Sequence, residues 1–137
     1  MVAVSEIEIV KEIHVPEADI LMRADGIVHV LYKKNVTLDI ELQMKMFHLF
    51  KELTGNVKHP FVFSALEGVV VTKEARDNAI VIEDESPVSA VAVIADNLAY
   101  RLIANFYLKV NKPKNPYKVF KKMDEALAWL QQFKPKT

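Results

Sequence analysis

The stretch "SPVSAVAVIADNLAYRLIANFYLKVNKPKNPYKVF", Ser86 to Phe120, decides the fold because it contains a strand, a helix and a second strand. Its first eleven residues are nearly continuously apolar, which is typical of a strand covered on both faces. An apolar stripe of helical spacing follows, and "YKVFKK" resumes as a strand. Short links between such elements predict parallel strands with a crossover helix. The stripe consists of Leu98, Leu102, Ile103, Phe106 and Val110.

The same alternation continues toward both ends of the chain. "HPFVFSAL" (59–66) predicts a buried strand, and "TKEARDNAIVIED" (72–84) predicts a helix whose first amides Thr72 can cap. After the last strand, "MDEALAWLQQF" (123–133) predicts a helix with Asp124 as its cap. Its apolar coverage comes from Leu127, Trp129 and Leu130.

An earlier helix is predicted from Thr37 onward, because the apolar period changes there to three and four residues. Either Thr37 or Asp39 can cap its start, and Gly55 stands where a helix commonly ends. The period rests on Leu38, Leu42, Met46, Leu49 and Leu53.

The amino-terminal third predicts strands: "SEIEIVKEIHV" (5–15), "ADILMRA" (18–24) and "IVHVLYK" (27–33). The Asp25-Gly26 pair between two apolar runs is a hairpin signal. The sequence therefore predicts a single α/β domain over residues 1–137. This domain is expected to have an N-terminal β-hairpin followed by a mixed, mostly parallel sheet with about four helices.

Composition limits the class of protein. With 51% hydrophobic and 26% charged residues the chain can bury a core, and its formal net charge is zero. From Leu98 onward, however, one Arg and eight Lys face only Asp124 and Glu125, which leaves about +7 there. The chain contains no cysteine, no apolar run of membrane-spanning length and no signal-peptide pattern in its first residues. We expect a cytoplasmic protein.

No catalytic, metal or nucleotide signature is found. Four histidines fall in different predicted elements without a metal-ligand spacing, and the three glycines form no phosphate-binding loop. No serine stands in a nucleophile elbow, and the carboxylates at 83–85 and 124–125 fit a loop and a helix start. We expect neither enzymatic activity nor a cofactor. The histidines are His14, His29, His48 and His59.

The lysine-rich stretch 105–122 carries aromatic residues between its charges, a pattern that can bind single-stranded nucleic acid. A pI of about 6.9 is far from the pI above ~9 of a dedicated nucleic-acid binder, so we do not expect that partner. Pro113 and Pro116 predict a stiff link with solvated lysines. These lysines can present a basic patch to an acidic partner or a lipid headgroup, and the acidic remainder of the chain also allows a homodimer.

Three segments carry a family resemblance: "VVVTKEARDNA" (69–79), "NLAYRLIANFYLKVNKPKNPYKVF" (97–120) and "MDEALAWL" (123–130). Together they resemble an uncharacterised bacterial branch of the SpoIIAA-like, or STAS-like, domains, over roughly residues 26–133. The resemblance implies a βα superhelix around a mixed sheet, without enzymatic activity. It also implies a regulatory protein-interaction domain similar to anti-sigma factor antagonists.

In the regulatory members, a kinase-like anti-sigma factor phosphorylates a Ser or Thr at a helix start within an Asp-Ser-x-Gly type motif. The corresponding loop here is "EGVVVTKEA" (67–75), which lacks the motif and offers Thr72 as its hydroxyl residue. Phosphate at a helix N-terminus is favoured by free amides, but an ordinary capping threonine occupies the same position. Thr72 is therefore either a phospho-acceptor or a helix cap.

The resemblance also extends to the CRAL-TRIO lipid-binding domains, which implies an alternative function: a module that binds a lipid or small apolar ligand, or a membrane surface. Phe106 and Tyr107 beside Lys109 suit an interfacial contact and equally suit a core-facing helix. Exposure of Tyr107 together with Leu108 would favour the contact surface. The predicted partner surface consists of Glu74, Arg76, Arg101, Asn105, Lys109, Lys112 and Lys114.

Overall fold

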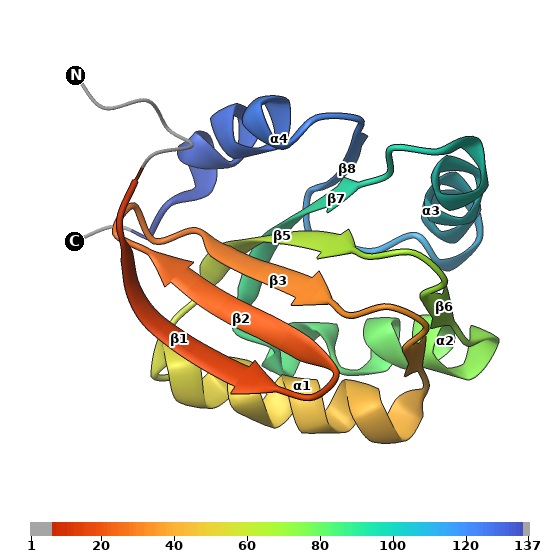
Figure 1. Cartoon of the computed structure of the whole chain (residues 1–137), viewed down its shortest axis with the longest axis horizontal. Coiled ribbons are helices and arrows are strands. Elements are labelled where there is room, and N and C mark those ends of the chain that lie inside the picture. The colour runs from red at the N-terminus through yellow and green to blue at the C-terminus, as the bar shows by residue number, and fades with distance from the viewer. Residues whose placement is uncertain (1–6, 136–137) are drawn as a thin grey trace.

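A computed structural model describes residues 7–135. Within that range, six strands form one sheet in the order β1-β2-β3-β5-β7-β8, with β1, β2 and β3 antiparallel and the rest parallel (Figure 1). The strands are β1 (Ile9–Val15), β2 (Ala18–Arg23), β3 (Val28–Tyr32), β5 (His59–Ala65), β7 (Val88–Ile94) and β8 (Tyr117–Phe120). The predicted mixed, mostly parallel sheet is confirmed.

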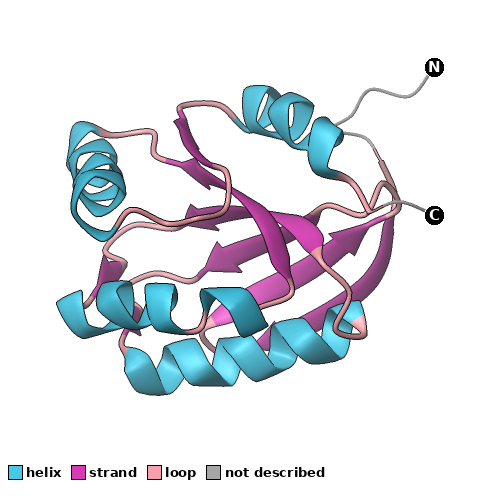
Figure 2. Cartoon of the chain, turned by 180° about the vertical axis from the view of Figure 1, so that it is seen from behind, coloured by secondary structure: helices cyan, strands magenta, loops and turns pink. Residues whose placement is uncertain are grey.

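Four helices accompany the sheet in the described part of the chain: α1 (Ile40–Thr54), α2 (Lys73–Val81), α3 (Leu98–Asn111) and α4 (Met123–Leu130). Helices α1 and α2 lie side by side on one face, and α4 covers the opposite face (Figure 2). Helix α3 stands apart at the end of the sheet near β6 (Figure 1). A small parallel ladder joins β4 (Thr37–Leu38) to β6 (Val70–Val71) at that end.

The helix ends follow local sequence signals with one exception. Asp39 caps α1 by accepting a hydrogen bond from the Leu42 amide, and Gly55 ends it in the left-handed conformation at φ 63°. Thr37 belongs to β4 instead. The prediction that Asp124 caps the last helix is wrong, because α4 begins at Met123 and Asp124 lies within its first turn. There its charge meets the positive end of the helix dipole.

The hairpin turn at Ala24–Gly26 joins β2 to β3, and a buried ion pair strengthens it. Arg23 donates to Asp25 at 3.0 and 3.1 Å, and Gln131 from the C-terminal 3-10 turn Gln131–Phe133 donates to the same carboxylate at 3.0 Å. Gly26 adopts φ 85° and lies so near Pro135 that a Cβ would approach its Cδ to 2.8 Å. The first predicted strand started at Ser5; residues 5 and 6 lie outside the described residues, and β1 starts at Ile9.

Two apolar cores pack on opposite faces of the sheet. The larger core lies between the sheet and α1, where Phe50 meets Phe61 edge to face at 4.9 Å. The smaller core lies under α4 and includes Ile27, Val62 and Leu130. Because strands β3, β5 and β7 carry apolar residues on both faces, they form the buried centre of the fold.

Candidate ligand-binding site

A cavity of about 320 Å³ lies between α3, α2, α1 and the sheet. This volume is within the range of small-molecule sites, roughly 300–1,000 Å³. Its walls are mostly apolar: Phe47 and Phe50 come from α1, Phe63 from β5, and Val91 and Val93 from β7. The cavity lies beneath α3, which contacts the sheet at β8.

One face of α3 forms a wall of the cavity, with Tyr100, Ala104 and Tyr107 facing it. The Tyr100 hydroxyl donates to Leu66 O and accepts from the Val69 amide, both at 3.2 Å, and so ties α3 to the loop after β5. Of the fourteen residues of α3, all described, Ala104 is the buried one. The helix is therefore held by few contacts.

The other end of α3 is attached through polar and aromatic contacts. Asn111 donates to the Asp77 carboxylate of α2 at 2.9 Å. The Tyr107 ring contacts the Tyr117 ring of β8 at 5.3 Å between centroids. Burial, and then the nearby Glu83, raise the pKa of Tyr107 to about 12, and burial also raises the pKa of Tyr117. Both phenols therefore stay protonated at neutral pH and can donate hydrogen bonds toward the cavity.

Arg76 and Glu83 are the charged side chains of the cavity wall among the described residues. Arg76 donates from Nη1 to Val71 O at 2.8 Å. Glu83 accepts from the backbone amides of Lys114 and Asn115 at 2.9 and 3.3 Å. The lysine-rich link thus packs on the acidic turn Glu83–Glu85. Its backbone is fixed by these hydrogen bonds as well as by Pro113 and Pro116.

Thr72 is the N-cap of α2, and its hydroxyl accepts a hydrogen bond from the Ala75 amide at 3.1 Å. The capping role of this residue is thus observed directly. Phosphorylation is compatible with a half-buried position at a helix start, but the hydroxyl would have to leave its bond to Ala75.

The residues predicted as a partner surface lie at several separate places in the structure. Arg76 lines the cavity, whereas Glu74 is exposed on α2. Lys114 pairs with Asp84 at 3.3 Å, so the basic link and the acidic turn are neighbours rather than opposite ends of the molecule. The remaining members lie on or just after α3: Arg101, Asn105, Lys109 and Lys112.

The predicted apolar stripe of α3 is exposed. Leu98 has 63% of its surface exposed and Phe106 has 55%, values far from those of a core-facing stripe. Tyr107 and Leu108, whose joint exposure would have marked a contact surface, are half-buried. The predicted pair therefore does not meet its criterion for a contact surface. The exposed apolar residues of α3 are Leu98, Leu102, Ile103, Phe106 and Val110, which we name the outer stripe; Ile103, at its edge, also borders the cavity.

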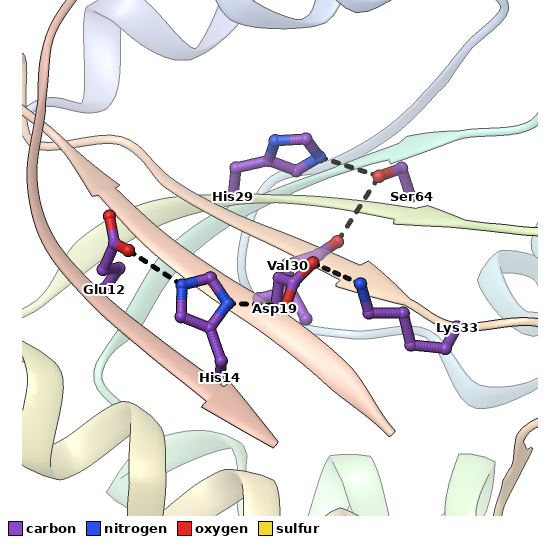
Figure 3. Close-up of polar contacts among 7 residues, drawn as sticks. All are labelled: Glu12, His14, Asp19, His29, Val30, Lys33 and Ser64. Carbon is purple, nitrogen blue, oxygen red and sulfur yellow. Dashed lines mark hydrogen bonds and ion pairs between the residues drawn. The ribbon is translucent and has the colours of Figure 1, made fainter. Parts of the chain in front are cut away.

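Three histidines make polar contacts on the sheet: His59 bonds to Gly26 O at 2.7 Å, and Figure 3 shows the contacts of the other two. His14 bonds to Asp19 at 2.6 Å and to Glu12 at 2.9 Å, and these bonds, the one to Asp19 first, raise its pKa. His29 bonds to Ser64 at 2.7 Å, and burial lowers its pKa. Between residues 7 and 135 no group of three metal-ligating side chains comes together.

Sequence reasoning missed the residues that build the cavity. The sequence does not predict Tyr100 and Tyr117, which line the cavity, or Asn111, which attaches α3 to α2, because no local pattern distinguishes them from ordinary helix and strand residues. The one available signal was the apolar character of α3 on both sides, with Tyr100, Ala104 and Tyr107 at helical spacing opposite the outer stripe.

Comparison with solved structures identifies the fold. An uncharacterized protein of the DUF3478 family from Shewanella loihica PV-4, described as having a SpoIIAA-like fold, aligns with a TM-score of 0.55 at 15% identity. The alignment covers 90% of this chain and 93% of that one. The architecture is therefore a SpoIIAA-like α/β fold, as predicted. The chain belongs to the family "Domain of unknown function (DUF7793)", whose model matches residues 20–134.

One other solved structure has a much lower structural similarity. A protein with unknown function from Arthrobacter sp. FB24 aligns at 22% identity over 81% of this chain and 96% of its own, with a TM-score of 0.30. No curated protein matches the sequence. In the described residues, no helix has the length and apolar character needed to cross a membrane.

Proposed function

We propose that this domain binds a small apolar ligand in the cavity beneath α3. The observation that carries the proposal is the cavity itself, about 320 Å³ in volume and lined mainly by aliphatic and aromatic side chains. The cavity is open on one side, so its apolar lining is exposed to water. A ligand that covers this lining removes apolar surface from water, which favours binding.

The weak attachment of α3 supports entry of a ligand. The helix is fastened by the Tyr100 hydroxyl at one end, by the bond from Asn111 to Asp77 at the other, and by Ala104 and the Tyr107–Tyr117 ring contact between them. Surface hydrogen bonds of this kind contribute about 1 kcal/mol each. Widening the cavity by moving α3 therefore costs less than moving α1, which is held by six buried residues.

The experiment is a titration with 1-octanol followed by methyl NMR. We expect saturable shifts at methyl groups of the cavity wall, such as Val71, Val91 and Val93, because the ligand occupies the space next to them. Methyl groups of Leu127 and Leu130, in the core under α4, stay unchanged and serve as internal controls.

A cavity-filling variant sharpens this test. Val93→Phe places a ring in the cavity and is expected to abolish the shifts, whereas Val57→Phe at an exposed loop position leaves them intact. The proposal fails if the wild-type domain shows no saturable shift, or if Val93→Phe binds 1-octanol as the wild type does.

A regulatory protein-interaction role is the second candidate, and the outer stripe favours it. A row of exposed apolar side chains on one helix face, next to Lys109 and Lys112, suits a protein partner with an apolar groove and an acidic rim. This role corresponds to the non-enzymatic, anti-sigma factor antagonist type of function, with Thr72 as its phospho-acceptor.

The test of the second candidate compares three variants in a quantitative pull-down. Leu102→Glu and Phe106→Glu place a charge in the outer stripe and are expected to release a retained partner, while Val57→Glu, an equally exposed position elsewhere, keeps it. A gain of phosphate mass that Thr72→Ala removes would support the switch. Equal retention by all three variants would contradict this role.

A further inference from the structure

This inference rests on the proposed ligand site. The positions of the two charged residues in the cavity wall indicate which charge the polar group of the ligand carries. The two charged wall residues stand at opposite ends of α2, because Arg76 lies in its first turn and Glu83 follows its last. Seven residues of helical and 3-10 backbone separate them by roughly 10 Å along the axis. The cavity therefore has a positive end and a negative end.

At the negative end, the Glu83 carboxylate already accepts hydrogen bonds from the protein backbone. The two carboxylate oxygens of Glu83 accept the backbone amides of Lys114 and Asn115. Glu83 thus holds the link in place, and its charge disfavours an anionic group nearby. The protonated phenols of Tyr107 and Tyr117 line the same region.

The positive end has unused binding capacity. A guanidinium carries five N–H donors, and the observed bond of Arg76 to Val71 O uses one of them. Among residues 7–135, no carboxylate lies within ion-pair distance of Arg76. An arginine at the edge of an apolar cavity is suited to a carboxylate, which it can bind through two parallel hydrogen bonds.

Cavity size limits the length of the chain attached to that carboxylate. A volume of about 320 Å³ is at the low end of the range for small-molecule sites, which favours a short chain over a long-chain lipid. We propose that the ligand is a medium-chain monocarboxylate, with its carboxylate on Arg76 and its chain along α2 toward Tyr107 and Tyr117. Octanoate has this size and chemistry.

The experiment measures octanoate and 1-octanol by calorimetry on the wild-type domain, Arg76→Gln and Arg101→Gln. Loss of a charge-assisted pair of hydrogen bonds weakens octanoate by about tenfold or more in Arg76→Gln and leaves 1-octanol within about twofold. Arg101→Gln, which removes an arginine of α3 that does not line the cavity, changes neither affinity.

The outcomes separate this inference from the proposed function. Binding of 1-octanol without octanoate, or octanoate affinity unchanged in Arg76→Gln, overturns the carboxylate assignment while the apolar site remains. Failure of both ligands to bind overturns both. Because Arg76 also bonds to Val71 O, the thermal stability of Arg76→Gln is recorded, and octanol binding by that variant shows that its cavity is intact.

Discussion

Helices α1 and α3 are of similar length, fifteen and fourteen residues, yet they relate to the sheet in opposite ways. Helix α1 buries six residues against the sheet, including Met46, Phe50 and Leu53, whereas α3 buries Ala104 alone. Both have an apolar face, but that of α3 is turned outward. The comparison indicates that α1 contributes far more than α3 to the buried core, and both proposed functions involve the less tightly packed helix.

The largest expected effect tests the α1 side of this comparison. Phe61→Ala removes a ring that is fully buried and contacts Phe50 and Phe63. We expect the free energy of unfolding, measured in urea, to fall by about 4 kcal/mol, because the change leaves a cavity in the larger core. A loss below ~1 kcal/mol would mean that this core does not dominate stability.

A smaller effect is expected at the buried ion pair of Arg23 with Asp25, which also accepts a hydrogen bond from Gln131. Burial alone would raise the pKa of Asp25, but bonds from Arg23, Gln131 and the Ile27 amide outweigh it and hold that pKa below its ordinary value of 3.8. A lowered folded-state pKa stabilises the domain above the ordinary value, and this stabilisation is lost as the pH falls through the folded value.

Asp25→Asn is therefore expected to lower the free energy of unfolding by about 3 kcal/mol at pH 7 and to flatten its decline below pH ~4. Urea unfolding at several pH values measures both, with Asp124→Asn, in the exposed first turn of α4, as the matched control. An unchanged acid slope in Asp25→Asn would show that this carboxylate does not govern acid stability.

Tyr100→Phe tests how α3 is attached. The change removes the hydroxyl that bonds to Leu66 O and the Val69 amide, so we expect a loss of about 1 kcal/mol in unfolding free energy. Amide hydrogen exchange should become faster in α3 and stay unchanged in α1, because α1 is held by buried side chains. Equal acceleration in both helices would contradict independent attachment of α3.

The smallest effect is expected at the outer stripe. Phe106→Ala removes a ring that is largely exposed, and surface substitutions of this kind usually change stability by less than ~0.5 kcal/mol. Urea unfolding of Phe106→Ala beside Phe61→Ala measures the contrast directly. A loss comparable to that of Phe61→Ala would place the stripe in the core and remove the difference between the two helices.

Local signals predicted most of the elements of this fold. Asp39 and Gly55 delimit α1 because a cap and a left-handed glycine act within one turn of the chain. The continuous apolar run at Val88–Ile94 identified a central strand for a similar reason. Asp124 was misplaced by two positions because α4 starts at Met123 after Lys122, which makes no side-chain cap bond.

The candidate site could be predicted only in part. Arg76 was selected as a surface residue, yet it lines a cavity with residues from α1, β5, β7 and α3. Helix α3 carries apolar residues on both sides, so its sequence period does not determine which side faces the sheet. Tyr107 and Phe106 are adjacent in sequence, yet Tyr107 lines the cavity whereas the Phe106 side chain is exposed to solvent.

The sequence by itself determined the succession of the main strands and helices and the helix start at Thr72, and it narrowed the start of α1 to Thr37 or Asp39, since these depend on neighbouring residues along the chain. Only the tertiary structure decided that the outer stripe faces solvent and that a cavity lies beneath α3. Both depend on how α3 is placed against β8, α2 and the loop after β5. That placement is set by contacts such as Tyr100 with Leu66, Asn111 with Asp77 and Tyr107 with Tyr117, which join residues distant in sequence.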